Sequence, residues 1–102
     1  MPSREVLPEE AAERHARGEA TVVDVRTMRE WRAHHIPGSV HIPLDEIHAR
    51  YEELNPHADT LVICAHGVRS AVATRWLETM GFPRVANIRH GICRWPGPLE
   101  QG

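Results

Sequence analysis

Apolar residues in this chain gather into short runs that alternate with stretches of helical character. Four runs are short enough for strands, and they lie at residues 21–25, 40–42, 60–64 and 85–88. A short apolar run bounded by turn signals is typical of a strand that is buried on both faces of a sheet. Strands that alternate with helices in this way favour an α/β fold with a parallel sheet.

The first two helices have recognisable starts. Pro8 begins a predicted helix over residues 8–17, whose first turn is acidic. Thr27 and Glu30 are spaced as a capping box, in which the Thr27 hydroxyl accepts from the Glu30 amide and the Glu30 carboxylate reaches back. A short helix should follow and end before the Pro-Gly turn at 37–38.

Two further helices are predicted at 45–54 and 70–80, because apolar residues recur there at helical spacing. The buried face of the first is expected to consist of Ile47, Tyr51 and Leu54, and that of the second of Val72, Trp76, Leu77 and Met80. The tail from Gly91 contains several prolines and glycines and is expected to be irregular.

Length and composition are those of one soluble globular domain, which we expect to span residues 1–102. Apolar residues make up 41% of the chain and charged residues 25%. The net charge of −2 provides no basic field for nucleic acid. The first residues lack the apolar run of a signal peptide, and no apolar stretch has the length of a membrane span. We expect a cytoplasmic protein without nucleic-acid or membrane partners; its oligomeric state stays open.

The two cysteines, Cys64 and Cys93, are too few for a disulfide scaffold and form no CxxC pair. The eight histidines show no H-E-x-x-H or similar spacing, so no metal site is predicted. Cys93 lies near the tail, and we interpret it as a bystander. Cys64, by contrast, ends the most apolar of the predicted strands.

The residues after Cys64 turn this cysteine into a candidate nucleophile. A tight loop with Gly67 follows it, and a helix should begin at about Ser70. Backbone amides at such a helix start converge on one point, as in a phosphate-binding loop. A thiolate at that point is stabilised by the amides and the helix dipole, so its pKa should fall. Without the loop, Cys64 would be interpreted as a buried structural cysteine.

Other loop residues have separate expected contributions. Gly67 allows backbone angles that other residues resist. Arg69 places a fixed positive charge near an anionic substrate, and Ser70 can cap the helix. His66 is interpreted as an exposed side chain that contributes only its amide, with a role as acid or base as the alternative.

A series of short motifs extends along most of the chain. The loop, Cys64-Ala65-His66-Gly67-Val68-Arg69-Ser70, has the form CxxGxRS; before it come Asp24-Val25-Arg26, Glu30-Trp31 and the run HIPGSVHIP at 35–43, and after it Gly91-Ile92 with Trp95. In this order the motifs resemble the rhodanese family. Each motif alone is weak evidence, whereas together they are specific.

This resemblance implies a single rhodanese-like domain with a central parallel sheet of about five strands, flanked by helices on both faces. It implies that Cys64 attacks the outer sulfur of thiosulfate, releases sulfite, and passes the sulfur from a persulfide to cyanide or a thiol. The thiol could belong to a thioredoxin-like or sulfur-carrier protein. No cofactor is implied.

The resemblance also implies site residues. The persulfide and the anionic donor would be bound by the loop residues Ala65, His66, Gly67, Val68, Arg69 and Ser70. Asp24 and Arg26 are interpreted as a supporting ion pair that braces the loops.

The sequence departs from the family pattern at three places. His34 stands where glycine usually precedes the His-Ile-Pro-Gly run, His90 replaces the first glycine of a Gly-Gly pair, and His41 stands where asparagine is common. These changes leave the loop intact, and we expect them to alter the rim of the site and the choice of partner.

Three alternatives stay open. Cysteine phosphatases and arsenate reductases use a Cys-x5-Arg loop, whereas Cys64 and Arg69 form the shorter Cys-x4-Arg, which suits a single sulfur atom better than a tetrahedral phosphate. A non-catalytic binding module would usually lack the cysteine. A persulfide carrier in a protein sulfur relay would use the same residues as a thiosulfate enzyme.

Overall fold

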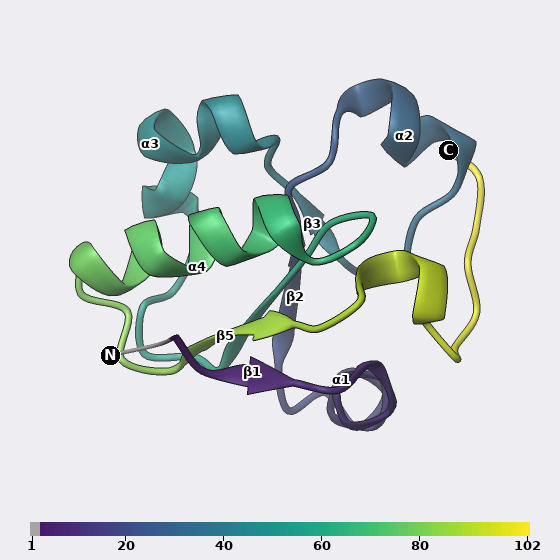
Figure 1. Cartoon of the computed structure of the whole chain (residues 1–102), viewed down its shortest axis with the longest axis horizontal. Helices are drawn as coiled ribbons and strands as arrows, with labels where there is room; N and C mark the ends of the chain where they lie inside the picture. The colour runs from purple at the N-terminus through teal and green to yellow at the C-terminus, as the bar shows by residue number, and fades with distance from the viewer. Residues whose placement is uncertain (1–2) are drawn as a thin grey trace.

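The computed structural model describes residues 3–102, and over these residues it shows one five-stranded sheet in which all paired strands are parallel (Figure 1). The strands are β1 (Glu5–Val6), β2 (Thr21–Asp24), β3 (Val40–His41), β4 (Thr60–Ile63) and β5 (Val85–Ile88). Across the sheet their order is β1-β5-β4-β2-β3. The predicted α/β fold with about five parallel strands is therefore confirmed.

Helices and short 3₁₀ helices connect the strands of the described chain. The α-helices are α1 (Pro8–Ala16), α2 (Met28–Ala33), α3 (Ile47–Arg50) and α4 (Val68–Thr79). The 3₁₀ helices are η1 (Leu44–Glu46), η2 (Tyr51–Glu53) and η3 (Gly91–Arg94). The helix predicted over 45–54 is thus divided into three short pieces, although Ile47 and Leu54 are buried and Tyr51 is partly buried as expected.

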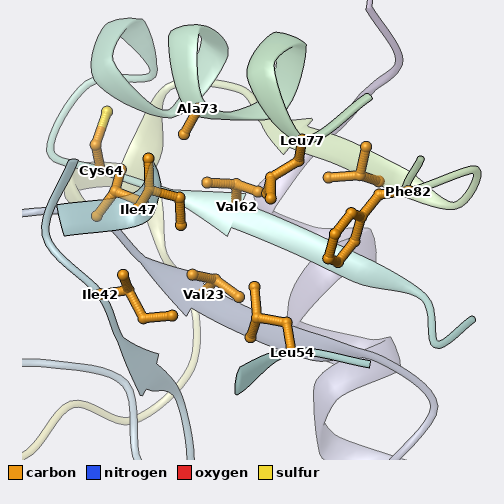
Figure 2. Packing of buried hydrophobic residues seen from close by; sticks show 11 residues of the cluster. Val23, Ile42, Ile47, Leu54, Val62, Cys64, Ala73, Leu77 and Phe82 are labelled. Atoms are coloured by element: carbon orange, nitrogen blue, oxygen red, sulfur yellow. The ribbon is translucent and has the colours of Figure 1, made fainter. Parts of the chain in front are cut away.

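Both faces of the sheet are covered, as expected for parallel strands. On one face the sheet packs against α3 and α4, as Figure 2 shows for the residues around Val62. On the other face, Leu61, Ile63 and Ile88 pack with Ala11 of α1 and Ile92 of η3. Successive residues of a strand point to opposite faces, so each strand supplies both halves of the core.

The strand register brings the predicted site residues to one edge of the sheet. Asp24, the last residue of β2, pairs with Ile63, the last residue of β4. Consequently Arg26 and Cys64 leave neighbouring strands at the same carboxyl edge. In open parallel sheets this edge is where ligands usually bind.

Helix α4 begins at Val68, two residues earlier than predicted. Gly67 occupies the N-cap position with φ +97°, and no side chain caps the helix. Ser70 therefore lies inside the first turn and is fully buried. The prediction that Ser70 caps the helix is wrong, because the chain already turns at Gly67.

The buried face of α4 also differs from the predicted one. Its buried residues are Ser70, Ala73, Thr74 and Leu77, whereas Val72 and Met80 are exposed. Small residues at this spacing let the helix lie close to the sheet, and Trp76 packs edge-on against Tyr51 at the side. The prediction considered only large apolar side chains, so it placed the buried face of α4 on a different side of the helix from the observed one.

The sequence pattern did not indicate β1, which has two residues and pairs with β5. The tail, expected to be irregular, begins with η3. Further on, Glu100 pairs in an antiparallel bridge with His35. Among the described residues, no helix combines the length and the apolar character that crossing a membrane requires.

Candidate active site

Cys64 follows β4 directly and is almost fully buried, with 1% of its surface exposed. Residues 65–67 form a tight loop before α4, and in its left-handed conformation Gly67 donates its N–H to Cys64 Sγ at 3.1 Å. A Cβ at position 67 would lie 3.2 Å from the His90 nitrogen. Glycine is favoured here by the backbone angle, and a side chain would also meet the chain after β5 closely.

The surroundings of the thiol act on its pKa in opposite directions. Burial raises the pKa of Cys64, but the hydrogen bond between the sulfur and the Ser70 hydroxyl and those with the amides of Ser70, His66 and Gly67 outweigh this effect. The pKa of Cys64 therefore lies below its usual value, in the direction expected for a thiolate at a helix start.

Ser70 connects the sulfur to β5. Its hydroxyl oxygen lies 3.3 Å from Cys64 Sγ, and the hydroxyl donates to Oδ1 of Asn87. The Asn87 amide in turn donates to the carbonyl oxygen of Gly67 at 3.2 Å and reaches the carboxylate of Glu5 at 3.4 Å. Neither Asn87 nor Glu5 was predicted as part of the site. The available signal was a single amide within the otherwise apolar strand 85–88.

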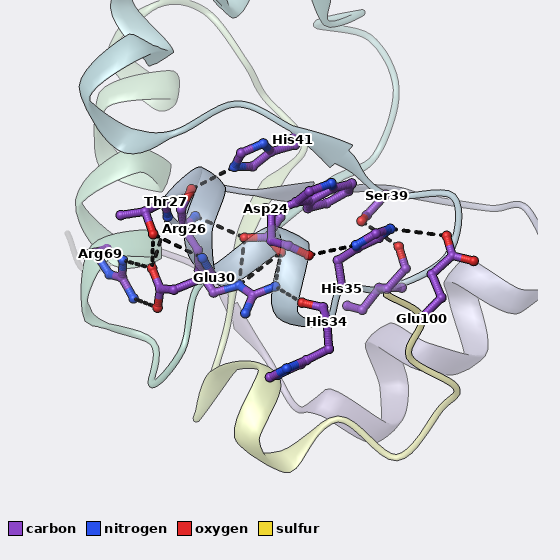
Figure 3. Close-up of polar contacts among 12 residues, drawn as sticks. Asp24, Arg26, Thr27, Glu30, His34, His35, Ser39, His41, Arg69 and Glu100 are labelled. Atoms are coloured by element: carbon purple, nitrogen blue, oxygen red, sulfur yellow. Dashed lines mark hydrogen bonds and ion pairs between the residues drawn. The ribbon is translucent and has the colours of Figure 1, made fainter. Parts of the chain in front are cut away.

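Arg69 does not extend freely over the loop. It forms two hydrogen bonds with the Glu30 carboxylate, at 2.7 and 2.9 Å (Figure 3). Glu30 also accepts from the backbone amide of Thr27, and its own amide donates to the Thr27 hydroxyl, so the predicted capping box is confirmed. Chiefly because of Arg69, the pKa of Glu30 is lowered to about 2.

The Arg69–Glu30 pair ties the first turn of α4 to α2. Arg69 was expected to place a fixed positive charge near an anionic substrate; in the structure Glu30 compensates much of that charge. Arg69 nevertheless remains within the electrostatic influence of the sulfur. The pKa of Arg69 is raised mainly by its hydrogen bonds to Glu30, with smaller contributions from the charges of Glu30, Cys64 and Asp24.

Asp24 and Arg26 form the buried ion pair that the sequence suggested. Arg26 Nη2 lies 2.8 Å from Asp24 Oδ2, Nε contacts both carboxylate oxygens, and the Arg26 amide donates to Oδ1. Arg26 also donates to the carbonyl oxygen of His34 at 2.7 Å. The pair therefore braces the chain between β2 and the end of α2, as expected.

Each of the three histidine departures has a structural setting. His34 is in extended backbone after α2, a conformation open to any residue. The His41 ring donates to the carbonyl oxygen of Arg26 at 2.8 Å and stacks on Trp31. His90 has φ +64°, which costs a non-glycine residue about 1 kcal/mol or more.

Gly91, the glycine that is retained, has no such freedom. A Cβ at this position would overlap the carbonyl groups of Cys64 and Ala65. The next residue, Ile92, donates its amide to the Cys64 carbonyl oxygen at 2.9 Å. The backbone of η3 therefore packs directly against the chain at Cys64 and Ala65, and only glycine allows this close contact.

The other side chains of the loop are exposed or partly buried. His66 and Val68 are exposed, and Ala65 is partly buried. Cys93 is also exposed, and its thiol donates to the carbonyl oxygen of His90 at 2.9 Å. Within residues 3–102, no group of three or more His, Cys, Asp or Glu side chains is placed to hold a metal ion.

An open pocket of about 600 Å³ lies beside the loop. Its walls are formed by residues of the β2–α2 connection, the start of α2, η1 with the preceding proline, and α4: Val25, Thr27, Met28, Pro43, Leu44, Asp45, Glu46 and Arg69. Cys64 does not line this pocket. The sulfur is covered by its own loop, and Arg69 is the link between loop and pocket.

In a comparison with known protein families, residues 7–97 match the model of the rhodanese-like domain. The chain belongs to the rhodanese-like family. This match covers the strand-loop-helix unit at Cys64, the Asp24–Arg26 pair and the glycine at 91, so the family predicted from short motifs is confirmed.

Several relatives of this rhodanese-like domain are named as sulfurtransferases or sulfur carriers. The thiosulfate sulfurtransferase GlpE of Pseudomonas entomophila is 34% identical over 97% of this chain and 94% of its own. The putative sulfur carrier protein YrkF of Bacillus subtilis is 42% identical over 78% of this chain, which spans only 43% of YrkF. The crystal structure of a rhodanese-related protein from Thermoplasma volcanium superposes with a TM-score of 0.89 at 29% identity, covering 97% of this chain and 99% of that one.

Proposed function

We propose that this rhodanese-like domain transfers sulfane sulfur from thiosulfate through a persulfide on Cys64. The observation that carries the proposal is the buried sulfur at the start of α4. An amide points at it from 3.1 Å, and hydrogen bonds hold its pKa below the usual value. A thiolate is the nucleophile in sulfur exchange, so this environment favours the attacking form at neutral pH.

The reaction balances without an oxidant or a cofactor. The Cys64 thiolate attacks the outer sulfur of thiosulfate, and the S–S bond of thiosulfate breaks with its electron pair leaving on sulfite. An acceptor such as cyanide or a thiolate then attacks the terminal sulfur of the persulfide. The Cys64 thiolate is regenerated as leaving group.

In this proposal the loop residues Ala65 to Ser70 surround the transferred sulfur. The terminal sulfur of a persulfide anion carries negative charge, which is stabilised by amides at the N-terminus of α4 and by the helix dipole. The side chain of Ser70 contacts the sulfur directly, whereas Arg69 acts from the edge of the pocket as part of its pair with Glu30.

The same geometry argues against a phosphatase. A tetrahedral phosphate needs several donors spread around its oxygens. Here the Cys-x4-Arg loop is short, and the Arg69 guanidinium is already engaged by both oxygens of Glu30. The alternative of a persulfide carrier in a protein relay is favoured by one specific observation, the 42% identity with YrkF.

The deciding experiment is the intact mass of the protein after incubation with thiosulfate, together with sulfite release. We expect the wild type to gain one sulfur atom, to release sulfite, and to return to its original mass when cyanide or a thiol is added. Cys64→Ala should show none of these changes, because the attacking sulfur is gone. Cys93→Ala, the matched control, should behave as the wild type.

Two outcomes would contradict the proposal. One is sulfur loading that survives Cys64→Ala and disappears in Cys93→Ala. The other is efficient hydrolysis of an aryl phosphate by the wild type without sulfite release from thiosulfate. Loading by a protein persulfide donor but not by thiosulfate would instead favour the relay carrier.

A further inference from the structure

Asn87 is the one side-chain amide buried in the middle of the described sheet, with 2% of its surface exposed. Its neighbours in β5, Val85, Ala86 and Ile88, are apolar and buried. A buried amide without hydrogen bonds costs free energy, so its partners determine what it does. These partners are Ser70, Gly67 and Glu5.

The partners determine which way the amide faces. The Gly67 carbonyl and the Glu5 carboxylate only accept hydrogen bonds, so the NH₂ group of Asn87 must face them. Oδ1 therefore faces Ser70, and the Ser70 hydroxyl must be the donor in that contact. A serine has a single hydroxyl proton, and here it is directed at Asn87.

The direction of the Ser70 proton determines how Ser70 can interact with the sulfur. Cys64 Sγ lies 3.3 Å from the Ser70 oxygen, whose proton is already used. While Cys64 is a thiol, its own S–H supplies the proton of this contact. When the sulfur is an anion, the Ser70 hydroxyl has to turn from Asn87 to the sulfur in order to stabilise it.

We propose that Asn87 is a positioning residue that holds the Ser70 proton away from Cys64 while the sulfur is a thiol and yields it when the sulfur is an anion. Asn87 thus connects the protonation state of Cys64 to β5 without touching the reacting atom. The inference rests on the proposed use of Cys64 as nucleophile.

Charged groups around the sulfur come from several elements. Arg69 of α4 is paired with Glu30 of α2, Asp24 is paired with Arg26 after β2, and Glu5 of β1 lies beyond Asn87. All of them are kept in the variants below, so changes in the ionisation of Cys64 report on Ser70 and Asn87. The exposed His66 and His90 flank the loop and are also kept.

The test measures the rate at which a small neutral reagent alkylates Cys64 as a function of pH, and the midpoint of this curve gives the apparent pKa. All variants carry Cys93→Ala, so that Cys64 is the one thiol that can react. Ser70→Ala should raise the midpoint, because the anion loses a donor. Asn87→Val should lower it, because a free Ser70 hydroxyl stabilises the anion without breaking another bond. Each shift should be roughly one pH unit, the size of one hydrogen bond to a charged group.

The double variant Ser70→Ala/Asn87→Val tests most directly whether Asn87 acts through Ser70. Its midpoint should equal that of Ser70→Ala alone, since Asn87 acts through the Ser70 proton. Thr74→Val is the matched control: Thr74 is fully buried in the same helix, and its hydroxyl bonds the Ser70 carbonyl. It should lower stability and leave the midpoint unchanged. Asn87→Ala should shift the midpoint in the same direction as Asn87→Val but less, because an admitted water can replace the lost acceptor.

Shifts of the same sign in Ser70→Ala and in both Asn87 variants would overturn the inference, as would an Asn87 effect that persists in the Ser70→Ala background. Should Asn87→Val not fold, Asn87→Ala carries the same comparison. Because alkylation needs no sulfur donor, these results are separate from the proposed function. The midpoint pattern without sulfur transfer would reject only the function, and sulfur transfer without the pattern would reject only the role of Asn87.

Discussion

Two groups of polar contacts flank the active loop, and they differ in charge. On the side of β2 and α2, the ion pairs Asp24–Arg26 and Glu30–Arg69 connect successive segments of the chain. On the side of β5, uncharged groups make the contacts: Ser70 contacts the sulfur, and Asn87 contacts Ser70. The ion pairs hold backbone segments in place and compensate their own charges. The uncharged groups touch the sulfur or its neighbour, so they act on its ionisation.

The comparison indicates how a small domain builds a reactive thiol. A full charge beside a buried sulfur would dominate its ionisation, whereas amides and a hydroxyl adjust it in smaller steps. Arg69 belongs to both sides, since it lies in the first turn of α4 and is held by Glu30 of α2. Substitutions in the ion pairs should therefore change mainly the stability of the fold, whereas substitutions of Ser70 or Asn87 should change mainly the reactivity of Cys64.

The largest effect is expected from Arg26→Met. It leaves the fully buried Asp24 carboxylate without its cation, which should lower the free energy of unfolding by about 3–5 kcal/mol. Urea denaturation measures this loss. Asp24→Asn/Arg26→Met removes both charges and should be clearly less damaging than Arg26→Met. Equal losses in the single and double variants would show that the buried charge is not what matters.

A smaller effect, on substrate use, is expected from Arg69→Ala. Removing this cation should lower kcat/KM for thiosulfate about tenfold or more, because one charge-assisted contact is worth about 1.5 kcal/mol or more. The rate of alkylation by a neutral reagent should change less than twofold at the pH of maximal thiolate. Arg84→Ala, at the opposite edge of the sheet, is the control and should change neither rate. Equal losses in both rates would assign Arg69 a purely structural role.

The smallest effect concerns the pH dependence of stability. The pKa of Glu30 is about 2 in the folded chain and 4.5 as its ordinary value. Since the folded pKa is the lower one, the pair stabilises the fold fully above pH 4.5, and this contribution is lost as the pH falls through about 2. Because Glu30 is 32% exposed, solvent screening limits the contribution to about 1 kcal/mol.

Glu30→Gln should therefore lower the free energy of unfolding at neutral pH and flatten its decline between pH 4.5 and 2. Glu53→Gln removes a carboxylate from an exposed pair with Arg50 and provides the comparison. We expect Glu53→Gln to change the pH dependence of the free energy of unfolding less than Glu30→Gln does. An unchanged slope in Glu30→Gln would show that the pair does not contribute to acid stability.

Much of the fold was predictable because its signals are local. The strands at 21–25, 60–64 and 85–88 are apolar runs, and each is observed with ends that differ by at most one residue. The capping box at Thr27 and the loop glycine at 67 were also predictable, since each is a pattern within a few residues. Strand β1 was not predictable, because two residues carry no periodic signal.

Local sequence patterns were enough to predict that a buried strand ends at a cysteine, that a glycine-containing turn follows, and that Asp24 and Arg26 at the end of β2 can pair. Which distant groups meet around that cysteine depends on how the whole chain packs. Glu30 and Arg69 are 39 positions apart, and Ser70 and Asn87 are 17 apart. Their contacts depend on strand order, register and the start of α4, which arise from packing over the whole domain rather than from any one segment.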